Sequence, residues 1–554
     1  MSRLHLEYYN GSGANQDKIP VNSDINNYIK ETEGEDYSHI LAIDDRWQVF
    51  YHLSQMRTSI LNWYEFKEDS EILEIGGEFG ALTGLLCDRC KNVTTVEYGE
   101  FKAKAIQERY SKRENLDIYA GNILEMPLEQ KFDYIVMIGC MERQCGGSKE
   151  PQKYINYLKY IRHFLKSDGK ILIAVENKYG LRYFCGEKEN YTNKPFGGIN
   201  QYQAPAKGYT FGRYELAQIL DKAGLEKFKF YYPLPDYKIP QMIYSDEYLP
   251  QKDLGERLLF YHIDATTLVA AEQWLYSDII DNQVFPFFAN SFLVECSVNA
   301  EEGDIVFAAV TTDRGRKHGL ATSVHGLDSK NRIVKKKALY LEGQDSVNAV
   351  YNNIIALKQR GISVVPHQFS KKTLVMPFVN ASTCSDYLRK LAIDRERNKF
   401  EQIFQMIYEN ILQSSETVHS EENALPEAKE IKRDYGTILK NCYIEMIPFN
   451  CFFVDGVLLY FDQEFVKENY PASYPMYRAL MYTYAFIPEA ESLIPLEIMK
   501  ERYCLTDLWD IYRKEEERFV ADNRRYDVYK NFYLWTGLNM TRMLQNAEML
   551  GKIV

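Results

Sequence analysis

A glycine-rich stretch that follows an acidic residue is the part of the sequence best suited to bind a ligand. It runs "EILEIGGEFGALTGLL" from Glu71 to Leu86, with apolar residues before and after the glycines. A loop of this kind between a strand and a helix presents backbone N–H groups and a helix N-terminus to a ligand. Gly76 and Gly80 would let the backbone turn and approach that ligand closely.

A second acidic residue, Glu97, follows roughly 20 residues further on, where nucleotide-binding folds hold ribose hydroxyls with a carboxylate. The loop lacks the G-x-G-x-x-G spacing of dinucleotide sites, because Glu78 stands between Gly76 and Gly80. A pyrophosphate would be repelled by Glu78, so a ligand without phosphate fits this loop better. A Rossmann-like domain that binds a nicotinamide dinucleotide, or no ligand at all, remains the alternative.

The elements that must position these residues alternate between strands and helices. Such alternation indicates βαβ units and a parallel sheet, which makes the fold class α/β. The run "FDYIVMIG" is continuously apolar, as a buried parallel strand should be. The predicted strands are 71–76, 93–98, 116–122, 132–139 and 170–177, with two later strands at 227–238 and 290–298.

The character of the chain changes at about residue 300, which predicts a second domain. We expect a polar N-terminal arm over 1–43 and a first domain over 44–299, with an insertion at 241–285. From 300 to 554, short strands and turns come first and long helical patterns follow, which indicates an α+β domain.

The composition argues against several classes of protein, namely nucleic-acid-binding, membrane-spanning and secreted proteins. The 554 residues carry a formal net charge of −12, and an acidic chain is a poor general binder of nucleic acid. No apolar run approaches the ~18 residues of a transmembrane helix, and no signal peptide is recognisable. Cys87 and Cys90 fall in a predicted helix, which favours reduced thiols over a zinc site. We therefore expect a cytoplasmic protein.

The glycine loop and the strands after it resemble successive motifs of class I S-adenosylmethionine-dependent methyltransferases. "LEIGGEFGALTGLL" resembles the first motif, "VEY" the second, "AGNILEMP" the third and "FDYIVMIG" the fourth, in the usual order. The resemblance implies a Rossmann-like domain that binds S-adenosyl-L-methionine. It departs from the family pattern at Glu78, where a glycine is usual. The cofactor-binding residues that it implies are Glu74, Gly76, Gly77, Gly80, Glu97 and Asn122.

The stretch "ENKYGLRYFCGEKENYTNKPFGGINQY", Glu176 to Tyr202, resembles bacterial methyltransferases associated with glycosyltransferases of surface polysaccharide synthesis. This implies a glycan or lipid-linked saccharide as acceptor, and glycosyltransferases as partners. Its aromatic, amide and hydroxyl groups suit sugars, although an irregular surface loop would have a similar composition. "NKPF" (Asn193–Phe196) resembles a box that methylates amide or adenine nitrogens. That box belongs after the fourth strand, where "GCMERQ" stands, so we do not expect nucleic acid as acceptor.

Methyl transfer needs positioning more than a nucleophilic side chain, and a base only where the acceptor loses a proton. Loops at the carboxyl edge of the predicted sheet offer three candidate catalytic residues, Glu142, Glu176 and Asn177.

The second half resembles protein-kinase-like phosphotransferases of the aminoglycoside type. Asn450 and Asp462 in "IPFNCFFVDGVLLYFDQE" have the spacing of the two Mg ligands, and Lys336 would meet the phosphates of Mg-ATP. Glu445 stands where a catalytic aspartate is expected. The domain could be an active kinase, a module that binds without transfer, or something else.

The order of domains is similar to bifunctional enzymes that terminate bacterial O-antigen chains, which favours a surface glycan and allows a peripheral location at the inner face of the membrane. Two alternatives stay open. One is a non-enzymatic scaffold in a polysaccharide-assembly complex, and the other is a small-molecule or protein methyltransferase. The sequence leaves open the methylated atom, the oligomeric state and whether Glu445 permits phosphoryl transfer.

Overall fold

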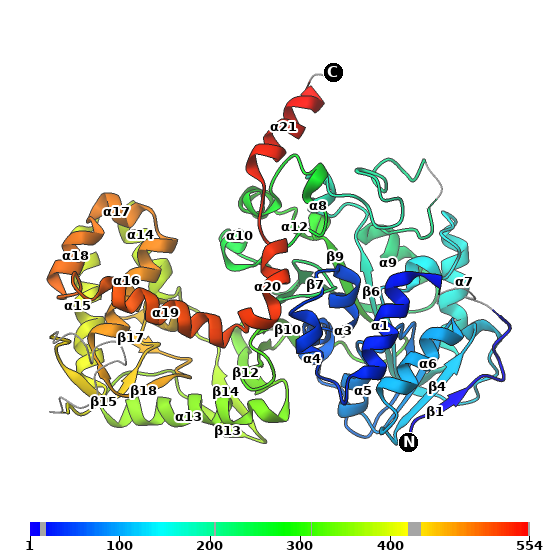
Figure 1. Cartoon of the computed structure of the whole chain (residues 1–554), viewed down its shortest axis with the longest axis horizontal. Coiled ribbons are helices and arrows are strands. Elements are labelled where there is room, and N and C mark those ends of the chain that lie inside the picture. The colour runs from blue at the N-terminus through cyan, green and yellow to red at the C-terminus, as the bar shows by residue number, and fades with distance from the viewer. Residues whose placement is uncertain (12–17, 204–205, 312, 419–433, 552–554) are drawn as a thin grey trace. The chain divides into compact units, whose positions relative to one another are not determined.

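The computed structural model describes residues 1–11, 18–203, 206–311, 313–418 and 434–551. The chain forms two compact units (Figure 1). Unit 1 comprises Met1–Gly315 and Arg525–Val554, and unit 2 comprises Arg316–Arg524.

The sheet of unit 1 has a parallel half that carries the glycine loop. Its strand order is β1-β4-β3-β2-β5-β6, all parallel. The strands are β1 (Arg3–His5), β2 (Glu71–Ile75), β3 (Asn92–Glu97), β4 (Leu116–Ala120), β5 (Phe132–Ile138) and β6 (Leu165–Glu176). The Rossmann-like α/β fold expected from the alternating pattern is confirmed.

The other half of the sheet is antiparallel and continues in the order β9-β7-β8-β10. These strands are β7 (Lys227–Leu234), β8 (Met242–Ser245), β9 (Ser291–Ser297) and β10 (Ile305–Val310). The predicted insertion at 241–285 therefore contributes one strand to the sheet as well as the helices α10 (Leu254–Arg257) and α11 (Tyr276–Asp281).

Helices cover both faces of the parallel strands, so most of the residues in the middle of these strands are buried and apolar. Ile135, Met137 and Ile173 are fully buried in one core cluster with residues of α7 and α9. The helices of this unit are α1 (Pro20–Glu31), α2 (Ser38–Leu41), α3 (Trp47–Leu53), α4 (Ser59–Asn62), α5 (Thr83–Arg89), α6 (Glu100–Arg109), α7 (Pro151–Arg162), α8 (Leu181–Phe184), α9 (Arg213–Lys222), α12 (Phe285–Phe288), α20 (Tyr526–Trp535) and α21 (Met540–Gly551).

The described part of the expected N-terminal arm belongs to the folded unit. β1 pairs with β4, and Arg3 Nε lies 2.6 Å from Asp117 Oδ1. Ile25 and Ile29 of α1 are buried in a cluster with Phe50. Their spacing of four residues puts both on one face of a helix, which the polar neighbours obscure in the sequence.

The end of the chain returns to unit 1, so the boundary expected at residue 299 differs from the one in the structure. β10 pairs with β8, and the ring of Phe532 on α20 stacks on Phe50 at 5.9 Å. Unit 2 is therefore an insertion between β10 and α20.

Unit 2 begins with four antiparallel strands, β11 (Leu320–His325), β12 (Ile333–Ala338), β13 (Gln368–Ser370) and β14 (Thr373–Pro377), and α13 (Gln344–Gln359) packs on them. Two further strand pairs follow, β15 (Ile438–Tyr443) with β18 (Val466–Pro471) and β16 (Cys451–Val454) with β17 (Val457–Tyr460). The helices are α14 (Cys384–Ile393), α15 (Arg397–Gln413), α16 (Ser473–Phe486), α17 (Glu489–Leu493), α18 (Leu496–Arg502) and α19 (Trp509–Asn523).

The mixed α and β content of unit 2 agrees with the expected α+β class, while its kinase-like character stays a prediction. The hairpin expected at Asp455-Gly456 is confirmed, with both residues at positive φ. Among the described residues, no helix is long and apolar enough to cross a membrane.

Candidate active site

An open cleft lies at the carboxyl end of β2 in unit 1, and the empty space in and around it, open solvent included, is about 420 Å³. The glycine loop forms one wall through Glu74, Gly76 and Gly77, and Gly139 after β5 lies in another. Because parallel strands all end at the same edge of a sheet, the loops after β2 and β5 meet there. This is the place where open α/β sheets bind their ligands.

The glycines of the loop are required by close packing. Gly76 has φ +79°, and a Cβ there would lie 2.9 Å from Cys140 Cβ. A Cβ on Gly77 would lie 2.6 Å from Thr95 Cγ2. Any side chain would therefore push the loop away from the sheet and into the cleft.

The side chain of Glu74 fixes the glycine loop through buried hydrogen bonds. Its Oε2 accepts hydrogen bonds from Thr83 Oγ1 at 2.6 Å and Thr95 Oγ1 at 2.8 Å. Burial raises the pKa of this carboxyl group. Glu74 thus ties β2 to β3 and to the start of α5 while it lines the cleft.

The other expected cofactor residues lie outside the cleft lining and have structural contacts. Glu97 accepts from the Glu78 N–H at 2.8 Å and from the Gly99 N–H at 3.3 Å, so it fixes the tip of the glycine loop. Gly80 packs against Tyr110, whose ring carbon would lie 2.8 Å from a Cβ. Asn122 caps the turn after β4 by accepting from the Leu124 N–H at 3.1 Å. Their contact with a cofactor stays a prediction.

Glu78, the departure from the usual motif, lies beside two cations, Arg143 and Lys102, and beside the ring of His52. Its carboxylate lies 2.6 Å from Arg143, 3.8 Å from Lys102 and 3.4 Å from His52 Nε2. Burial opposes ionisation, but Lys102, Arg143 and His52 together hold the pKa of Glu78 below its usual range. Glu78 is therefore neutralised within the protein, and the repulsion expected from the sequence is weakened.

Glu142 is the one catalytic candidate with an unsatisfied oxygen among the described residues. Its Oε1 accepts from the Glu176 N–H at 3.0 Å, while its buried Oε2 has no hydrogen-bond partner there. Burial, reinforced by the Glu176 carboxylate, raises the pKa of Glu142 to about 7. A carboxyl group with such a pKa can accept a proton near neutral pH.

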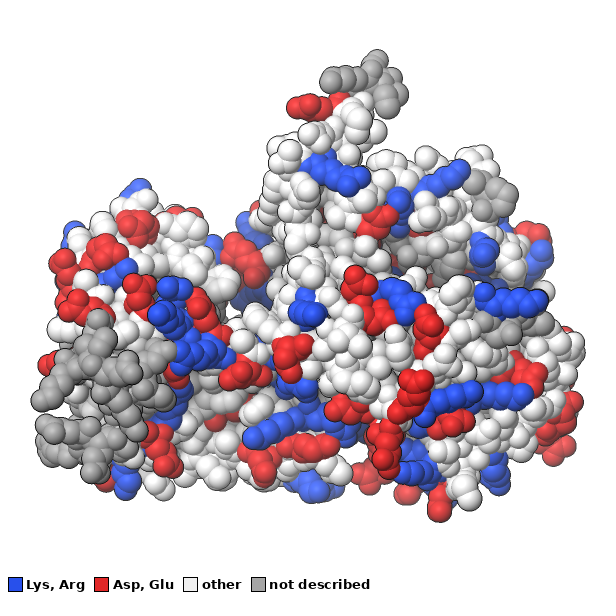
Figure 2. All heavy atoms as spheres, viewed as in Figure 1, with Lys and Arg blue, Asp and Glu red and all other residues white. Residues whose placement is uncertain are grey.

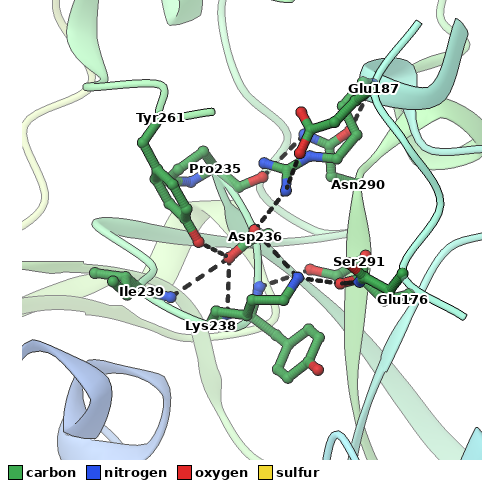
Figure 3. A network of polar contacts seen from close by, with 12 residues as sticks. Glu176, Glu187, Pro235, Asp236, Lys238, Ile239, Tyr261, Asn290 and Ser291 are labelled. Atoms are coloured by element: carbon green, nitrogen blue, oxygen red, sulfur yellow. Dashed lines mark hydrogen bonds and ion pairs between the residues drawn. The ribbon is translucent and has the colours of Figure 1, made fainter. Parts of the chain in front are cut away.

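Glu176 belongs to a buried ionic network at the ends of β6, β7 and β9 (Figure 3). It pairs with Lys238 and accepts from Tyr183 Oη at 3.0 Å and Asn190 Nδ2 at 2.8 Å. Asp236 in turn pairs with Arg182 at 2.7 Å. Buried charges are tolerated only when they are paired in this way, so both Glu176 oxygens are occupied by structural partners.

Asn177 has a structural environment. Its Nδ2 donates to Phe287 O and Ala289 O, each at 2.7 Å, and its Oδ1 accepts from the Tyr179 N–H at 3.0 Å. The amide thereby fixes the segment before β9 to the end of β6. Of the three candidates, Glu142 alone keeps a carboxyl oxygen without a hydrogen-bond partner among the described residues, although it is fully buried and does not line the cleft.

Three further cleft residues, which sequence reasoning missed, come from the segment before β2. Tyr51 and His52 lie at the end of α3, and Arg57 lies in the short 3₁₀ turn Gln55–Thr58. The helical apolar spacing of this segment predicts a core element. Only the cluster of Tyr, His and Arg at its end could have signalled a binding role.

In unit 2, the structure brings the four expected kinase-like residues near one another, and burial together with the Asp462 carboxylate raises the pKa of Glu445 to about 7. Lys336 on β12 forms an ion pair with Asp462, and Asn450 Nδ2 donates to Asp462 O at 3.4 Å. Glu445 instead accepts from the backbone N–H groups of Glu464 and Phe465. No cluster of three or more His, Cys, Asp or Glu residues suited to a metal occurs in the described part of the chain.

Comparisons with known proteins find methyltransferases. The family model of ribosomal RNA adenine dimethylases matches residues 48–145. A protein described as an uncharacterized methyltransferase of Staphylococcus carnosus is 30% identical over 153 residues, which cover 28% of this chain and 68% of that protein. Ribosomal RNA small subunit methyltransferase A of Fusobacterium nucleatum is 32% identical over 76 residues, 14% of this chain and 29% of that protein.

Among solved structures, the N-methyltransferase NodS from Bradyrhizobium japonicum, in complex with S-adenosyl-L-homocysteine, is similar with 20% identity and a TM-score of 0.22. The likeness covers 26% of this chain and 75% of that one.

Proposed function

We propose, since the chain belongs to the S-adenosylmethionine-dependent methyltransferases, that the cleft after β2 holds the cofactor and that the acceptor is a sugar or phosphate of a bacterial surface glycan. The observation that carries the first part is the glycine loop packed at the carboxyl edge of the sheet, where no side chain fits at Gly76 or Gly77. S-adenosylmethionine carries no phosphate, which is compatible with the acidic loop.

The segment Glu176–Tyr202 supports the second part, because it begins where β6 ends, at the same edge as the cleft. Burial and the nearby carboxyl groups of Glu142 and Glu176 raise the pKa of Tyr191 in this segment. Tyr237 brings another phenol to the cleft, since its Oη would lie 2.5 Å from a Cβ on Gly139. Aromatic rings together with a few polar groups are typical of ligand sites, and we propose that these phenols take part in holding a sugar.

Methyl transfer to a hydroxyl forms a new C–O bond as the methyl C–S bond breaks, and the hydroxyl proton must leave. The cofactor supplies an activated methyl group. The protein's part is to hold the acceptor oxygen in line with that methyl and to take the proton. Glu142 is the proposed base, because its Oε2 is unpartnered among the described residues and its pKa is about 7.

The test is transfer of tritiated methyl groups from S-adenosylmethionine to separated fractions: lipid-linked saccharides, nucleotide sugars, ribosomal RNA and protein. Label in either saccharide fraction is the expected result, and hydrolysis should release a methylated sugar or methyl phosphate. Label confined to RNA or protein would overturn the glycan proposal while leaving the methyltransferase assignment. Absence of label from every fraction, with cofactor binding intact, would favour the scaffold alternative.

Ribosomal RNA is a second candidate acceptor, favoured by the family model. Two features speak against it. The residues after β5 are Gly139-Cys140-Met141-Glu142, without the amide and aromatic box of enzymes that methylate adenine. The net charge is −12, and Figure 2 shows acidic and basic residues interspersed on the face in view.

For unit 2 we propose a kinase-like nucleotide site at Lys336, Asn450 and Asp462. The support is their proximity, although Lys336 is 126 residues before Asp462 in the chain. Glu445 is held by backbone N–H groups, so the site is better suited to binding Mg-ATP than to phosphoryl transfer. Calorimetry should find Mg-dependent ATP binding that Asp462→Ala abolishes. No binding to the wild-type protein would overturn this part.

A further inference from the structure

We infer that Arg57 and His52 bind the amino-acid end of S-adenosylmethionine, with Arg57 receiving its carboxylate and His52 accepting a hydrogen bond from its ammonium group. The inference rests on the proposed cofactor cleft and adds residues outside the glycine motifs. Both side chains line that cleft together with Gly76 and Gly77.

Arg57 is a buried cation without an acidic partner among the described residues. The residue is 2% exposed, and its NH1 donates to Tyr237 O at 3.1 Å and Lys238 O at 3.2 Å. Its guanidinium lies over the rings of Tyr51 and Tyr237, 4.8 and 5.6 Å from their centroids. These contacts fix the guanidinium plane but leave its charge unpaired.

An unpaired buried charge is costly, and a carboxylate is the partner that a guanidinium fork fits best. Glu74 lines the same cleft, and the charge of Arg57 acts to lower the pKa of its carboxyl group against burial, but its Oε2 is bound to two threonine hydroxyls and no ion pair joins it to Arg57 in the described structure. A carboxylate that belongs to a ligand would complete the site.

His52 supplies the complementary group. It is 7% exposed, and its Nδ1 has no hydrogen-bond partner among the described residues. Burial lowers the pKa of His52 to about 3. The Glu78 carboxylate raises this pKa, but the charges of Lys102 and Arg57 lower it further, so the ring is neutral.

The tautomer of His52 follows from its neighbour. Nε2 lies 3.4 Å from the Glu78 carboxylate, which favours a proton on Nε2 and leaves Nδ1 as an acceptor. A cation without an ion pair and an acceptor without a donor thus belong to two residues that line one cleft. A zwitterionic α-amino acid group satisfies both, and S-adenosylmethionine carries such a group.

The experiment compares two ligands by calorimetry. S-adenosylhomocysteine carries the amino-acid group, and 5′-methylthioadenosine lacks it. The wild-type protein should bind the first at least about 30-fold more tightly, as expected for charged hydrogen bonds. Arg57→Met should weaken S-adenosylhomocysteine by a similar factor and leave methylthioadenosine within about threefold, and His52→Phe should do so to a smaller extent.

The matched control is Arg113→Met, which removes an arginine of the same unit whose partners are Glu35 and Asp88. It should leave both affinities unchanged. Equal wild-type affinity for the two ligands would overturn the inference without any variant, as would an Arg57→Met protein that keeps the wild-type preference or loses both ligands equally. A wild-type protein that binds neither ligand would overturn the proposed cofactor cleft itself.

Discussion

At the scale of single residues, Gly76 shows how local backbone geometry shapes the cleft. Its positive φ and the nearby Cys140 both exclude a side chain. Gly146 also has a positive φ, but a Cβ there would meet nothing within 4 Å. Comparing substitutions at these two glycines therefore separates backbone strain, which both positions share, from collision with a neighbouring side chain, which only a substitution at Gly76 would cause.

We expect Gly76→Arg to weaken binding of S-adenosylhomocysteine by at least about 100-fold, because the new side chain would collide with Cys140 and displace the loop that lines the cleft. Gly146→Arg should carry a comparable cost of about 1–2 kcal/mol for its left-handed backbone and keep its affinity. Calorimetry measures binding, and circular dichroism checks the fold. Cofactor affinity unchanged in the Gly76 variant would contradict the motif assignment.

Glu142 gives the stability of the protein a predictable dependence on pH. Its pKa in the folded protein, about 7, lies above the ordinary value of 4.5. The folded state therefore binds more protons than the unfolded state between pH 4.5 and 7. The contribution of this group is fully present below pH 4.5 and is lost as the pH rises through 7, by at most about 3 kcal/mol.

Glu142→Gln should remove this loss, so the variant gains stability relative to wild type as the pH rises from 5 to 8. Urea unfolding at each pH measures the difference. The exposed Glu150, replaced by Gln, serves as control and should follow the wild-type curve. A difference between wild type and Glu142→Gln that does not change with pH would show that Glu142 is ionised at its ordinary pKa.

At the scale of elements, α1 and α3 explain how the edge of the cleft is supported. α1 buries Ile25 and Ile29 in the same cluster as Phe50 of α3, and α3 carries Tyr51 and His52 into the cleft. The segment that looked like a loose arm therefore holds part of the site in position.

Ile25→Ala should destabilise unit 1 by about 2–5 kcal/mol, since it opens a cavity at a fully buried site. Ile19→Ala, at the N-terminal cap of α1 and 49% exposed, should cost well under about 1 kcal/mol. Thermal unfolding in the presence and absence of S-adenosylhomocysteine measures both. Equal midpoints for the two variants would mean that α1 is not part of the folded core.

At the scale of the whole molecule, unit 1 is discontinuous in sequence. In its last part, the ring of Phe532 on α20 stacks on Phe50, and the ring centroids of Trp535 and Trp47 lie 5.4 Å apart. Asn531 Nδ2 also donates a hydrogen bond to Asp44 O at 3.1 Å. In the sequence, unit 2 is thus an insertion between β10 and α20 of unit 1.

A chain cut after Gly315 should therefore lose at least about 4 kcal/mol of stability and expose an aromatic surface. Joining residues 1–315 to 525–551 through a short Gly-Ser linker should restore both folding and binding of S-adenosylhomocysteine. Dye binding, gel filtration and calorimetry compare the two. Full stability of the chain that ends at Gly315 would contradict the discontinuous unit.

What the sequence determined by itself was the parallel half of the sheet and the place of the glycine loop. Both depend on short-range patterns, continuous apolar runs such as Phe132–Ile138 and glycines at fixed spacing, which need no knowledge of distant residues. The same holds for the hairpin at Asp455-Gly456.

Only the tertiary structure decided which side chains share the cleft and where the units divide. Arg57 and His52 meet the glycine loop, and Phe532 meets Phe50, through packing between segments that carry no mutual signal in the sequence. Likewise, Asn177 became a structural residue and Glu142 an unsatisfied acid because of hydrogen-bond partners supplied by other strands and loops. Burial and pairing are properties of the assembled fold, and they decide which polar residues remain available for chemistry.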